Sequence, residues 1–189
     1  MVSRTTFFGT DMSQVENAPI VLNRFLNIVK PETIIEIGTF KGGLSVLFSL
    51  YTIANNKRFV TYDIKDHIVN KEVFLKLSID LRISDVFKES VISEITSLIR
   101  SAGVTVLFCD GGNKIREFNL FGKVLKQGDY ILAHDYAKDK QFFNSQIKEN
   151  VWNWCEITDS DVQQTCVENN LEKDFLDLEL AAITCRVKK

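Results

Sequence analysis

Side chains that could bind a ligand follow the ends of several apolar runs in this sequence. Four acids and one histidine stand in these places: Asp63, Asp85, Asp110, His134 and Asp135. An acid after a strand is often only a turn or cap residue. Carboxylates also accept hydrogen bonds from ribose hydroxyls and adenine amino groups, and two carboxylates with an imidazole can hold a divalent cation. If these side chains meet at one place, they indicate a binding site rather than a set of separate turns.

A glycine-rich turn follows the first apolar run, Thr33–Ile37, whose β-branched residues predict a buried parallel strand. From Leu44 onward the chain is typical of the first turns of a helix. Glycine permits positive φ and lacks the Cβ that would hold a ligand away, and free N–H groups at a helix start attract carboxylate or phosphate. We therefore expect the ligand to be bound by Gly38, Thr39, Gly42 and Gly43. Glu36 would support the turn or contact an amino group of the ligand indirectly.

Two acids beyond this turn indicate the kind of ligand. Asp63 lies about 20 residues further on, where an acid at the end of a second strand binds both hydroxyls of a ribose. Asp85, one strand further out, can reach an adenine amino group. The turn has the form G-x-x-x-G-G and lacks the middle glycine of the dinucleotide pattern G-x-G-x-x-G. The pattern favours an adenosine-containing ligand whose other end is an amino acid rather than a pyrophosphate.

Strands and helices that would position these side chains alternate along the chain. Apolar runs predict strands over 33–37, 59–62, 79–83, 104–109 and 130–133. Helical spacing predicts helices over 15–29, capped by Asp11 or Ser13, and over 43–55, 72–77, 91–99, 115–125, 142–154 and 160–171. Residues 1–13 are expected to be irregular, and 176–187 a last strand or the second arm of a hairpin. The alternation indicates an α/β fold with a mostly parallel sheet, whose strands end at one edge.

Composition narrows the class of protein. The chain has 189 residues, a formal net charge of −2 and 45% hydrophobic residues, which predicts one domain and no general affinity for nucleic acid. It contains no apolar run of about 18 residues that could span a membrane, and residues 1–12 contain no apolar signal core. The four cysteines show no metal-binding spacing and are expected to be reduced thiols. A cytoplasmic location is consistent with these features.

The segment Glu36–Gly43 resembles the first motif of class I S-adenosylmethionine (SAM)-dependent methyltransferases, with Asp63 and Asp85 at the ribose-binding and adenine-contacting acids. The resemblance covers residues 12–136. The sequences GTxxGG, FCDGG and GDYILAHDY are similar to the O-methyltransferases related to cephalosporin hydroxylase and catechol methyltransferase. The resemblance implies a Rossmann-like, doubly wound, seven-stranded sheet with an antiparallel last strand, and SAM as cofactor. It divides the domain into a cap segment and helix (1–30), a cofactor-binding core (31–136) and C-terminal helices and strands (137–189).

The same resemblance implies a metal site. In that group an acid after the fourth strand and an acidic or amide pair after the fifth hold a divalent metal, magnesium or manganese, that orients a substrate hydroxyl. The match falls on Asp110, His134 and Asp135, which are therefore the expected catalytic and metal-binding residues. His134 stands where an acid is usual, which shifts the preference from magnesium towards manganese, iron or zinc and leaves a capping or core histidine as the alternative. Asn113 stands where relatives often have a basic residue, and Lys114 follows it, so no general base is assigned.

The function predicted from the sequence is methyl transfer from SAM to a hydroxyl group of a small molecule, with metal assistance. Two alternatives remain: a non-catalytic protein that binds an adenosyl ligand, and a metal-dependent oxidising enzyme on the same fold. The expected partner is the acceptor, with no nucleic acid or membrane, and a homo-oligomer is consistent with the aromatic-rich chain ends. Residues 7–12 resemble a segment that folds over the ligand. Trp152 and Trp154 are substrate contacts or core residues, and His67 is expected to be exposed to solvent.

Overall fold

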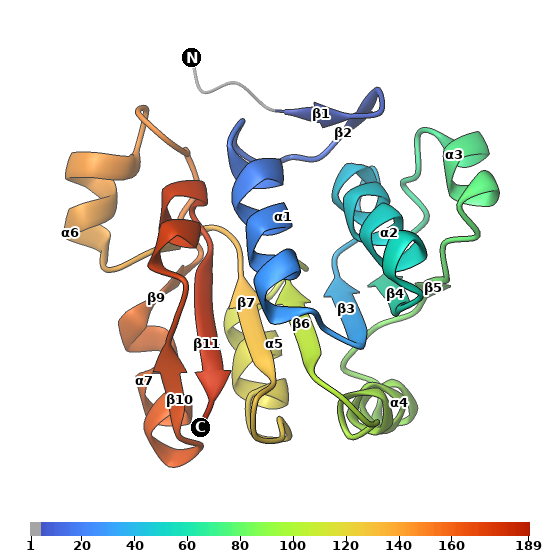
Figure 1. Ribbon diagram of the computed structural model, residues 1–189. Coiled ribbons are helices and arrows are strands. Elements are labelled where there is room, and N and C mark those ends of the chain that lie inside the picture. The colour runs from blue at the N-terminus through green and yellow to red at the C-terminus, as the bar shows by residue number, and fades with distance from the viewer. Residues whose placement is uncertain (1–4) are drawn as a thin grey trace.

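A computed structural model describes residues 5–189 of this chain; residues 1–4, part of the expected cap segment, lie outside the described range. Its centre is a seven-stranded sheet in the order β10-β11-β7-β6-β3-β4-β5 (Figure 1). Five of the strands are parallel, namely β3 (Thr33–Ile37), β4 (Arg58–Asp63), β5 (Leu81–Ile83), β6 (Thr105–Cys109) and β7 (Tyr130–Ala133). The other two, β11 (Thr184–Lys188) and β10 (Leu171–Lys173), are antiparallel to their neighbours. The predicted doubly wound fold with an antiparallel last strand is confirmed.

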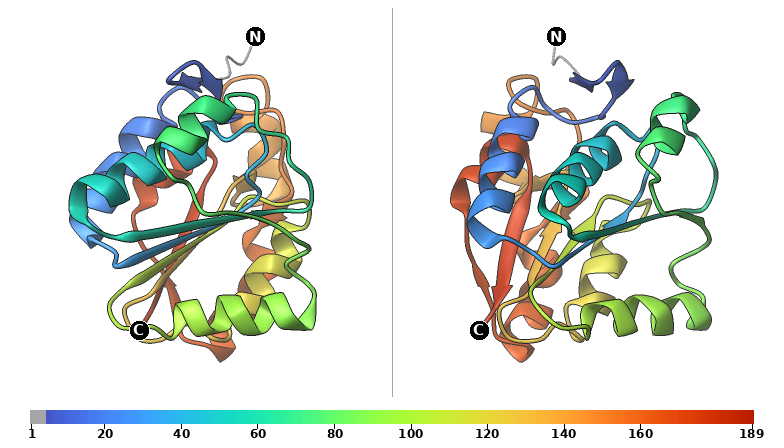
Figure 2. Two further views of the ribbon diagram at one scale, coloured as in Figure 1. Left: turned by 90° about the vertical axis from the view of Figure 1, so that its right-hand side faces the viewer. Right: turned by 45° about the vertical axis from the view of Figure 1, so that its right-hand side comes forward.

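Helices cover both faces of the sheet (Figure 2). One face carries α1 (Ala18–Val29) and α2 (Gly43–Asn55), and the other carries α4 (Glu89–Ile99), α5 (Lys114–Phe121) and α7 (Asp159–Glu168). Neighbouring residues of β3 separate the two cores, since Ile34 packs with the first pair of helices and Ile35 with the second group. Both side chains are fully buried. This explains why the strand is an unbroken apolar run rather than an alternating one.

The N-terminal segment is more ordered than its composition predicts. Strands β1 (Thr6–Phe7) and β2 (Thr10–Asp11) form a short hairpin above α1 and α2, where the sequence predicted irregular structure (Figure 1). The predicted caps of the first helix were also wrong. Asn17 precedes α1, and its side chain makes no capping hydrogen bond. Asp11 instead accepts hydrogen bonds from Ser13 and pairs with Lys41.

Two predicted C-terminal elements differ from the structure. The expected helix over 142–154 is only α6 (Lys140–Phe142) with one π-helical turn, η1 (Phe143–Ile147), and the chain then leaves helical geometry. The expected strand over 176–187 begins as a 3₁₀ helix, η2 (Leu176–Ala181), in which Leu178 alone of the three alternating leucines is buried. A short parallel pair, β8 (Tyr136–Ala137) and β9 (Ile157–Thr158), lies on either side of the first of these regions along the chain. The remaining helix, α3 (Lys71–Lys76), lies beyond α2.

Several boundaries also shift by a few residues. The helix predicted over 160–171 ends at Glu168, because Leu171 already belongs to β10. The helix predicted over 115–125 ends at Phe121, and the strand predicted over 79–83 begins at Leu81. Within residues 5–189, no helix is long and apolar enough to cross a membrane.

Candidate active site

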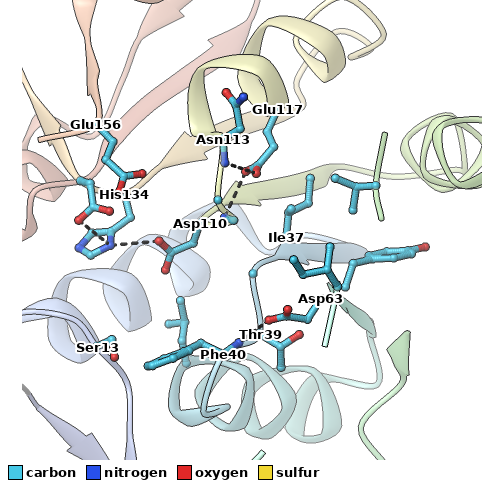
Figure 3. A pocket seen from close by; sticks show the side chains of 18 of the residues that line it. Ser13, Ile37, Thr39, Phe40, Asp63, Asp110, Asn113, Glu117, His134 and Glu156 are labelled. Atoms are coloured by element: carbon cyan, nitrogen blue, oxygen red, sulfur yellow. Dashed lines mark hydrogen bonds and ion pairs between the residues drawn. The ribbon is translucent and has the colours of Figure 1, made fainter. Parts of the chain in front are cut away.

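An open cavity of about 710 Å³ lies at the carboxyl ends of the parallel strands (Figure 3). The sheet brings seven of the predicted site residues to its wall: Gly38, Thr39, Asp63, Asp85, Asp110, His134 and Asp135. His67 also lines it and is exposed, as the sequence predicted. The cavity therefore joins the predicted adenosine-binding acids and the predicted metal-binding cluster in one space.

Three predicted cofactor residues lie outside the lining of this cavity. Glu36 is fully buried behind the turn, where it accepts a hydrogen bond from the Ser45 hydroxyl. Gly42 precedes α2 and is covered by the Phe74 ring, which a Cβ on Gly42 would approach to 2.3 Å. Gly43 begins α2 and is covered by the N-terminal segment, because a Cβ there would lie 2.6 Å from the carbonyl oxygen of Asp11. The lack of a side chain at Gly43 thus admits the chain's own backbone. Cofactor binding by these three residues stays a prediction.

The turn between β3 and α2 is held by the acid at the end of β4. Oδ2 of Asp63 accepts a hydrogen bond of 2.8 Å from the backbone N–H of Phe40, and Oδ1 accepts one of 3.2 Å from the N–H of Lys65. The hydroxyls of Thr39 and Thr61 are 2.6 Å apart. Each carboxylate oxygen has a second lone pair, so Asp63 can hold the turn and still accept from a ligand hydroxyl.

At the β5 end of the cavity, a carboxylate lies close in the chain to an aromatic ring. Oδ1 of Asp85 accepts a hydrogen bond of 2.9 Å from the N–H of Phe87, which closes a tight turn. The guanidinium of Arg116 lies 3.9 Å from the centre of the Phe87 ring and fixes that ring in place. Asp85 and Phe87 both line the cavity, with Val86 between them. This arrangement offers a flat apolar surface beside a hydrogen-bond acceptor, which suits a purine base.

The three residues predicted to bind a metal, Asp110, His134 and Asp135, lie close together, and their role as metal ligands stays a prediction. Nδ1 of His134 lies 3.2 Å from Oδ1 of Asp110 and 3.5 Å from Oδ1 of Asp135 (Figure 3). Asp135 adopts a positive φ of 55°, which is unusual outside glycine but accessible to aspartate. Neighbouring ligands of an octahedral ion with bonds of about 2.1 Å lie about 3 Å apart. The two distances from Nδ1 are close to this spacing, and one donor atom from each of the three residues lies within 4.8 Å of the others, so together they could hold one divalent ion.

Charges within the cluster shift the ionisation of its members. Burial disfavours the protonated His134, but the Asp110 and Asp135 carboxylates outweigh this effect and raise the pKa of the imidazole above its ordinary value. Burial also disfavours the charged Asp135, yet His134 and Lys114 hold the pKa of that carboxyl below its ordinary value. The carboxyl of Asp135 is therefore anionic at neutral pH.

Lys114 is a cation that the sequence left without a role. Its Nζ lies 2.8 Å from Oδ2 of Asp135, 2.9 Å from Oε2 of Glu156 and 3.6 Å from Oδ1 of Asp110, and it donates to the Gly111 carbonyl at 3.1 Å. Its side chain is only 6% exposed. The ammonium therefore neutralises part of the negative charge of the cluster, and it does so through Oδ2 of Asp135, the oxygen that does not face His134.

Two further groups orient the cluster. The indole Nε1 of Trp152 donates to Oδ1 of Asp135, and the indole ring packs against the His134 imidazole at 5.1 Å. Glu117 is a buried residue of α5, and its carboxylate accepts hydrogen bonds of 3.2 Å each from the backbone N–H groups of Gly111 and Asn113 in the loop after β6. Burial raises the pKa of Glu117 to about 7, although these hydrogen bonds oppose the shift. The sequence carried no local signal for either role.

Gln14 is the contact that sequence analysis missed entirely. Its side chain is fully buried, and its Nε2 donates to Oδ2 of Asp110 at 2.8 Å and lies 3.2 Å from Nδ1 of His134. It comes from the segment between β2 and α1, 96 residues before Asp110. Two buried atoms here have no hydrogen-bond partner among the described residues: Oε1 of Gln14 and Nε2 of His134.

The sheet order and the placement of the cavity define a class I methyltransferase fold. A model of the family described as "Rhamnosyl O-methyltransferase/CmcI" matches residues 1–170, and the chain belongs to this family. The predictions of a methyltransferase fold and of a SAM-dependent O-methyltransferase are confirmed by this membership. The family description names methyl transfer and so lends no support to the oxidising alternative.

Solved structures agree with this fold. The apo-structure of CmcI is 15% identical and has a TM-score of 0.68, with coverage of 98% of this chain and 77% of that chain. A CmcI structure described as containing magnesium and SAM has a TM-score of 0.66 at 15% identity, over 97% of this chain and 76% of that chain. An O-methyltransferase-like protein from Klebsiella pneumoniae has a TM-score of 0.55 at 12% identity, over 93% and 81%. No curated protein sequence matches this chain.

Proposed function

We propose that this chain transfers the methyl group of SAM to a hydroxyl of a small acceptor, with SAM on the Gly38–Asp85 side of the cavity and the acceptor beside the Asp110 cluster. The observation that supports this proposal is the continuity of the cavity between the two groups of side chains. A volume of about 710 Å³ is within the usual range for ligand sites. It is large enough for a nucleoside and part of an acceptor together.

The cofactor end would use three kinds of contact. The backbone at Gly38–Phe40 would meet the methionine part, Asp63 would accept hydrogen bonds from the ribose, and Asp85 with Phe87 would hold the adenine. Glu36 stays behind the turn and supports it through Ser45. The sulfonium of SAM is already a reactive methyl donor, so the protein mainly has to align the methyl group with the attacking oxygen.

At the acceptor end, Asp110, His134 and Asp135 would hold a divalent cation, either magnesium or manganese. Such a cation lowers the pKa of a hydroxyl and fixes its oxygen. The chain's own residues prepare this place. Lys114 and Trp152 orient the Asp135 carboxylate through an ion pair and a hydrogen bond.

The acceptor itself is proposed to be a small molecule rather than a nucleic acid. The net charge of −2 provides no general attraction for a polyanion, and the acceptor side of the cavity is lined by carboxylates. The indole rings of Trp152 and Trp154 pack at 5.0 Å and line this side together with Glu156. A flat, largely apolar wall next to carboxylates suits a ring that carries hydroxyl groups.

Calorimetric titration of SAM and S-adenosylhomocysteine tests this function. We expect micromolar binding by the native protein and a loss of at least about tenfold in Asp63→Ala. Glu72→Ala removes an exposed acid that only pairs with Lys76 and should bind both ligands like the native protein. Absence of binding by the native protein, with and without magnesium or manganese, would overturn the proposal.

A further inference from the structure

The side-chain amide of Gln14 lies beside the residues of the proposed metal site. The amide group is fully buried, and its nitrogen points at two of the three expected ligands, Asp110 and His134. Its oxygen has no partner within the described part of the chain. An unpaired carbonyl oxygen destabilises a fold when it is buried, so a partner for this oxygen is expected when the site is filled.

The hydrogen bonds that Gln14 makes conflict with a cation at the cluster. Nε2 of the amide lies 3.2 Å from Nδ1 of His134, a nitrogen that must be unprotonated to bind a cation. A cation at Nδ1 would be repelled by the positive N–H hydrogens of the nearby amide. This repulsion disappears if the amide turns by 180° about its last bond, because the turn exchanges the nitrogen and the oxygen without moving the backbone.

We propose that Gln14 is a fourth ligand of the divalent cation, which it would bind through the oxygen Oε1, and that metal binding thereby fastens the N-terminal segment to the sheet. This inference rests on the metal site of the proposed function. With Oε1 turned inward, the cluster offers three oxygens and one nitrogen, which suits magnesium or manganese. The amide adds an oxygen without adding charge beside the carboxylates of Asp110 and Asp135.

The N-terminal segment is built to carry such a ligand. The carbonyl of Gln14 accepts a hydrogen bond of 3.1 Å from the N–H of Thr5, and Met12 donates to the Thr5 carbonyl at 3.0 Å. Asp11 is tied to the glycine-rich turn through its ion pair with Lys41 at 2.9 Å. Met12 and Ser13 line the cavity. A ligand at position 14 would therefore couple the cation to the segment that closes one side of the cofactor cavity.

Manganese affinity measured by electron paramagnetic resonance tests the proposal, with no cofactor present. Gln14→Met keeps the size of the side chain but removes both the oxygen and the N–H, and we expect at least about tenfold weaker Mn²⁺ binding. Gln14→Glu supplies a charged oxygen, and we expect binding as tight as in the native protein or tighter. Weaker Mn²⁺ binding in Gln14→Glu than in the native protein would overturn the proposal, because a carboxylate at a ligand position strengthens cation binding. Unchanged binding in Gln14→Met would overturn it as well.

A control separates this inference from the function on which it rests. Asp110→Asn defines the signal of a lost metal site. A native protein that binds SAM but no Mn²⁺ would remove the metal site and Gln14's role in it, while leaving methyl transfer in place. If Gln14→Met does not fold, the sign of the change in Gln14→Glu decides alone.

Hydrogen exchange gives a second readout. Mn²⁺ should slow amide exchange over residues 5–14 of the native protein and have no such effect in Gln14→Met. Equal protection in both proteins would contradict the proposed link between the cation and the N-terminal segment.

Discussion

The ammonium of Lys114 lies 2.8 Å from Oδ2 of Asp135, while the other oxygen of the same carboxylate faces His134 at 3.5 Å. One carboxylate thus connects a fixed monovalent cation with the proposed metal position. Burial disfavours the charged Lys114, but Asp110 and Asp135 outweigh this and raise the pKa of the lysine above its ordinary value. The ammonium is therefore a permanent part of the charge balance at the site.

Replacing Lys114 by methionine should destabilise the protein and make it depend more strongly on metal. The change leaves buried acids without their cation, which costs about 3 kcal/mol in comparable sites. Urea unfolding in the presence of a chelator measures this loss. Because repulsion between the two cations is removed, Mn²⁺ should raise the melting temperature of Lys114→Met more than that of the native protein.

Lys76→Met is the matched control for this experiment, because Lys76 is exposed and, among residues 5–189, its ion pair is with the exposed Glu72. Its stability should change by less than about 0.5 kcal/mol. Equal stability of Lys114→Met and the control would show that the Lys114 ammonium does not balance the acidic cluster.

Replacing Trp152 by phenylalanine should separate metal binding from cofactor binding. The ring that packs against His134 is retained, but the N–H that holds Oδ1 of Asp135 is lost. Hydrogen-bond partners of metal ligands typically contribute 10- to 100-fold to affinity. We therefore expect about tenfold weaker Mn²⁺ binding with SAM affinity unchanged. A parallel loss of both affinities would mean that Trp152 supports the whole cavity rather than Asp135.

Replacing Gly38 by alanine should destabilise the fold much more than the same replacement at Gly112, another glycine that lines the cavity. The φ of Gly38 is +94°, and a Cβ there would lie 2.2 Å from the carbonyl oxygen of Asp110. The left-handed conformation alone costs about 1–2 kcal/mol for alanine, and the backbone contact adds to it. A Cβ on Gly112 would meet nothing within 4 Å. Thermal unfolding should show a large loss for Gly38→Ala and little change for Gly112→Ala, and similar losses would contradict this account.

The strand ends of the site were predictable because local sequence determines them. The runs Thr33–Ile37 and Thr105–Cys109 are apolar throughout, and both strands are buried on both faces. Parallel topology then places the residues after these strands at one edge, which is why Gly38, Asp110 and Asp135 meet as expected.

The features of the site that were not predicted from the sequence depend on contacts between residues far apart in the chain. Trp152 was expected to continue a helix, but its indole donates to Asp135 across 17 residues and the chain turns away. Gln14 has no motif around it, and its role arises only when it meets Asp110. Lys114 stands one position after Asn113, where relatives often have a basic residue, and its partner Glu156 is 42 residues distant. No periodicity or short motif encodes such pairs.

Glu36 should make the stability of the fold depend on pH. Burial raises the pKa of this carboxyl to about 8 from an ordinary value of 4.5, against the hydrogen bond from Ser45. The folded protein keeps the proton up to about pH 8, whereas the unfolded chain releases it near pH 4.5, so rising pH favours the unfolded chain in this interval. The contribution of Glu36 is complete below pH 4.5 and is lost as pH rises through the folded-state pKa, by about 1.4 kcal/mol per pH unit.

The measurement is the free energy of urea unfolding from pH 5 to pH 8, with a chelator present. The difference between Glu36→Gln and the native protein should grow with pH in favour of the variant, because glutamine stays neutral and can still accept from Ser45. Other titrating groups, including Glu117, occur in both proteins and cancel in the difference. Glu72→Gln removes an exposed carboxylate and should follow the native curve. If the curves of Glu36→Gln and the native protein ran parallel, Glu36 would have to be ionised in the fold, and its role would be that of a charged acceptor for Ser45 rather than a neutral support of the turn.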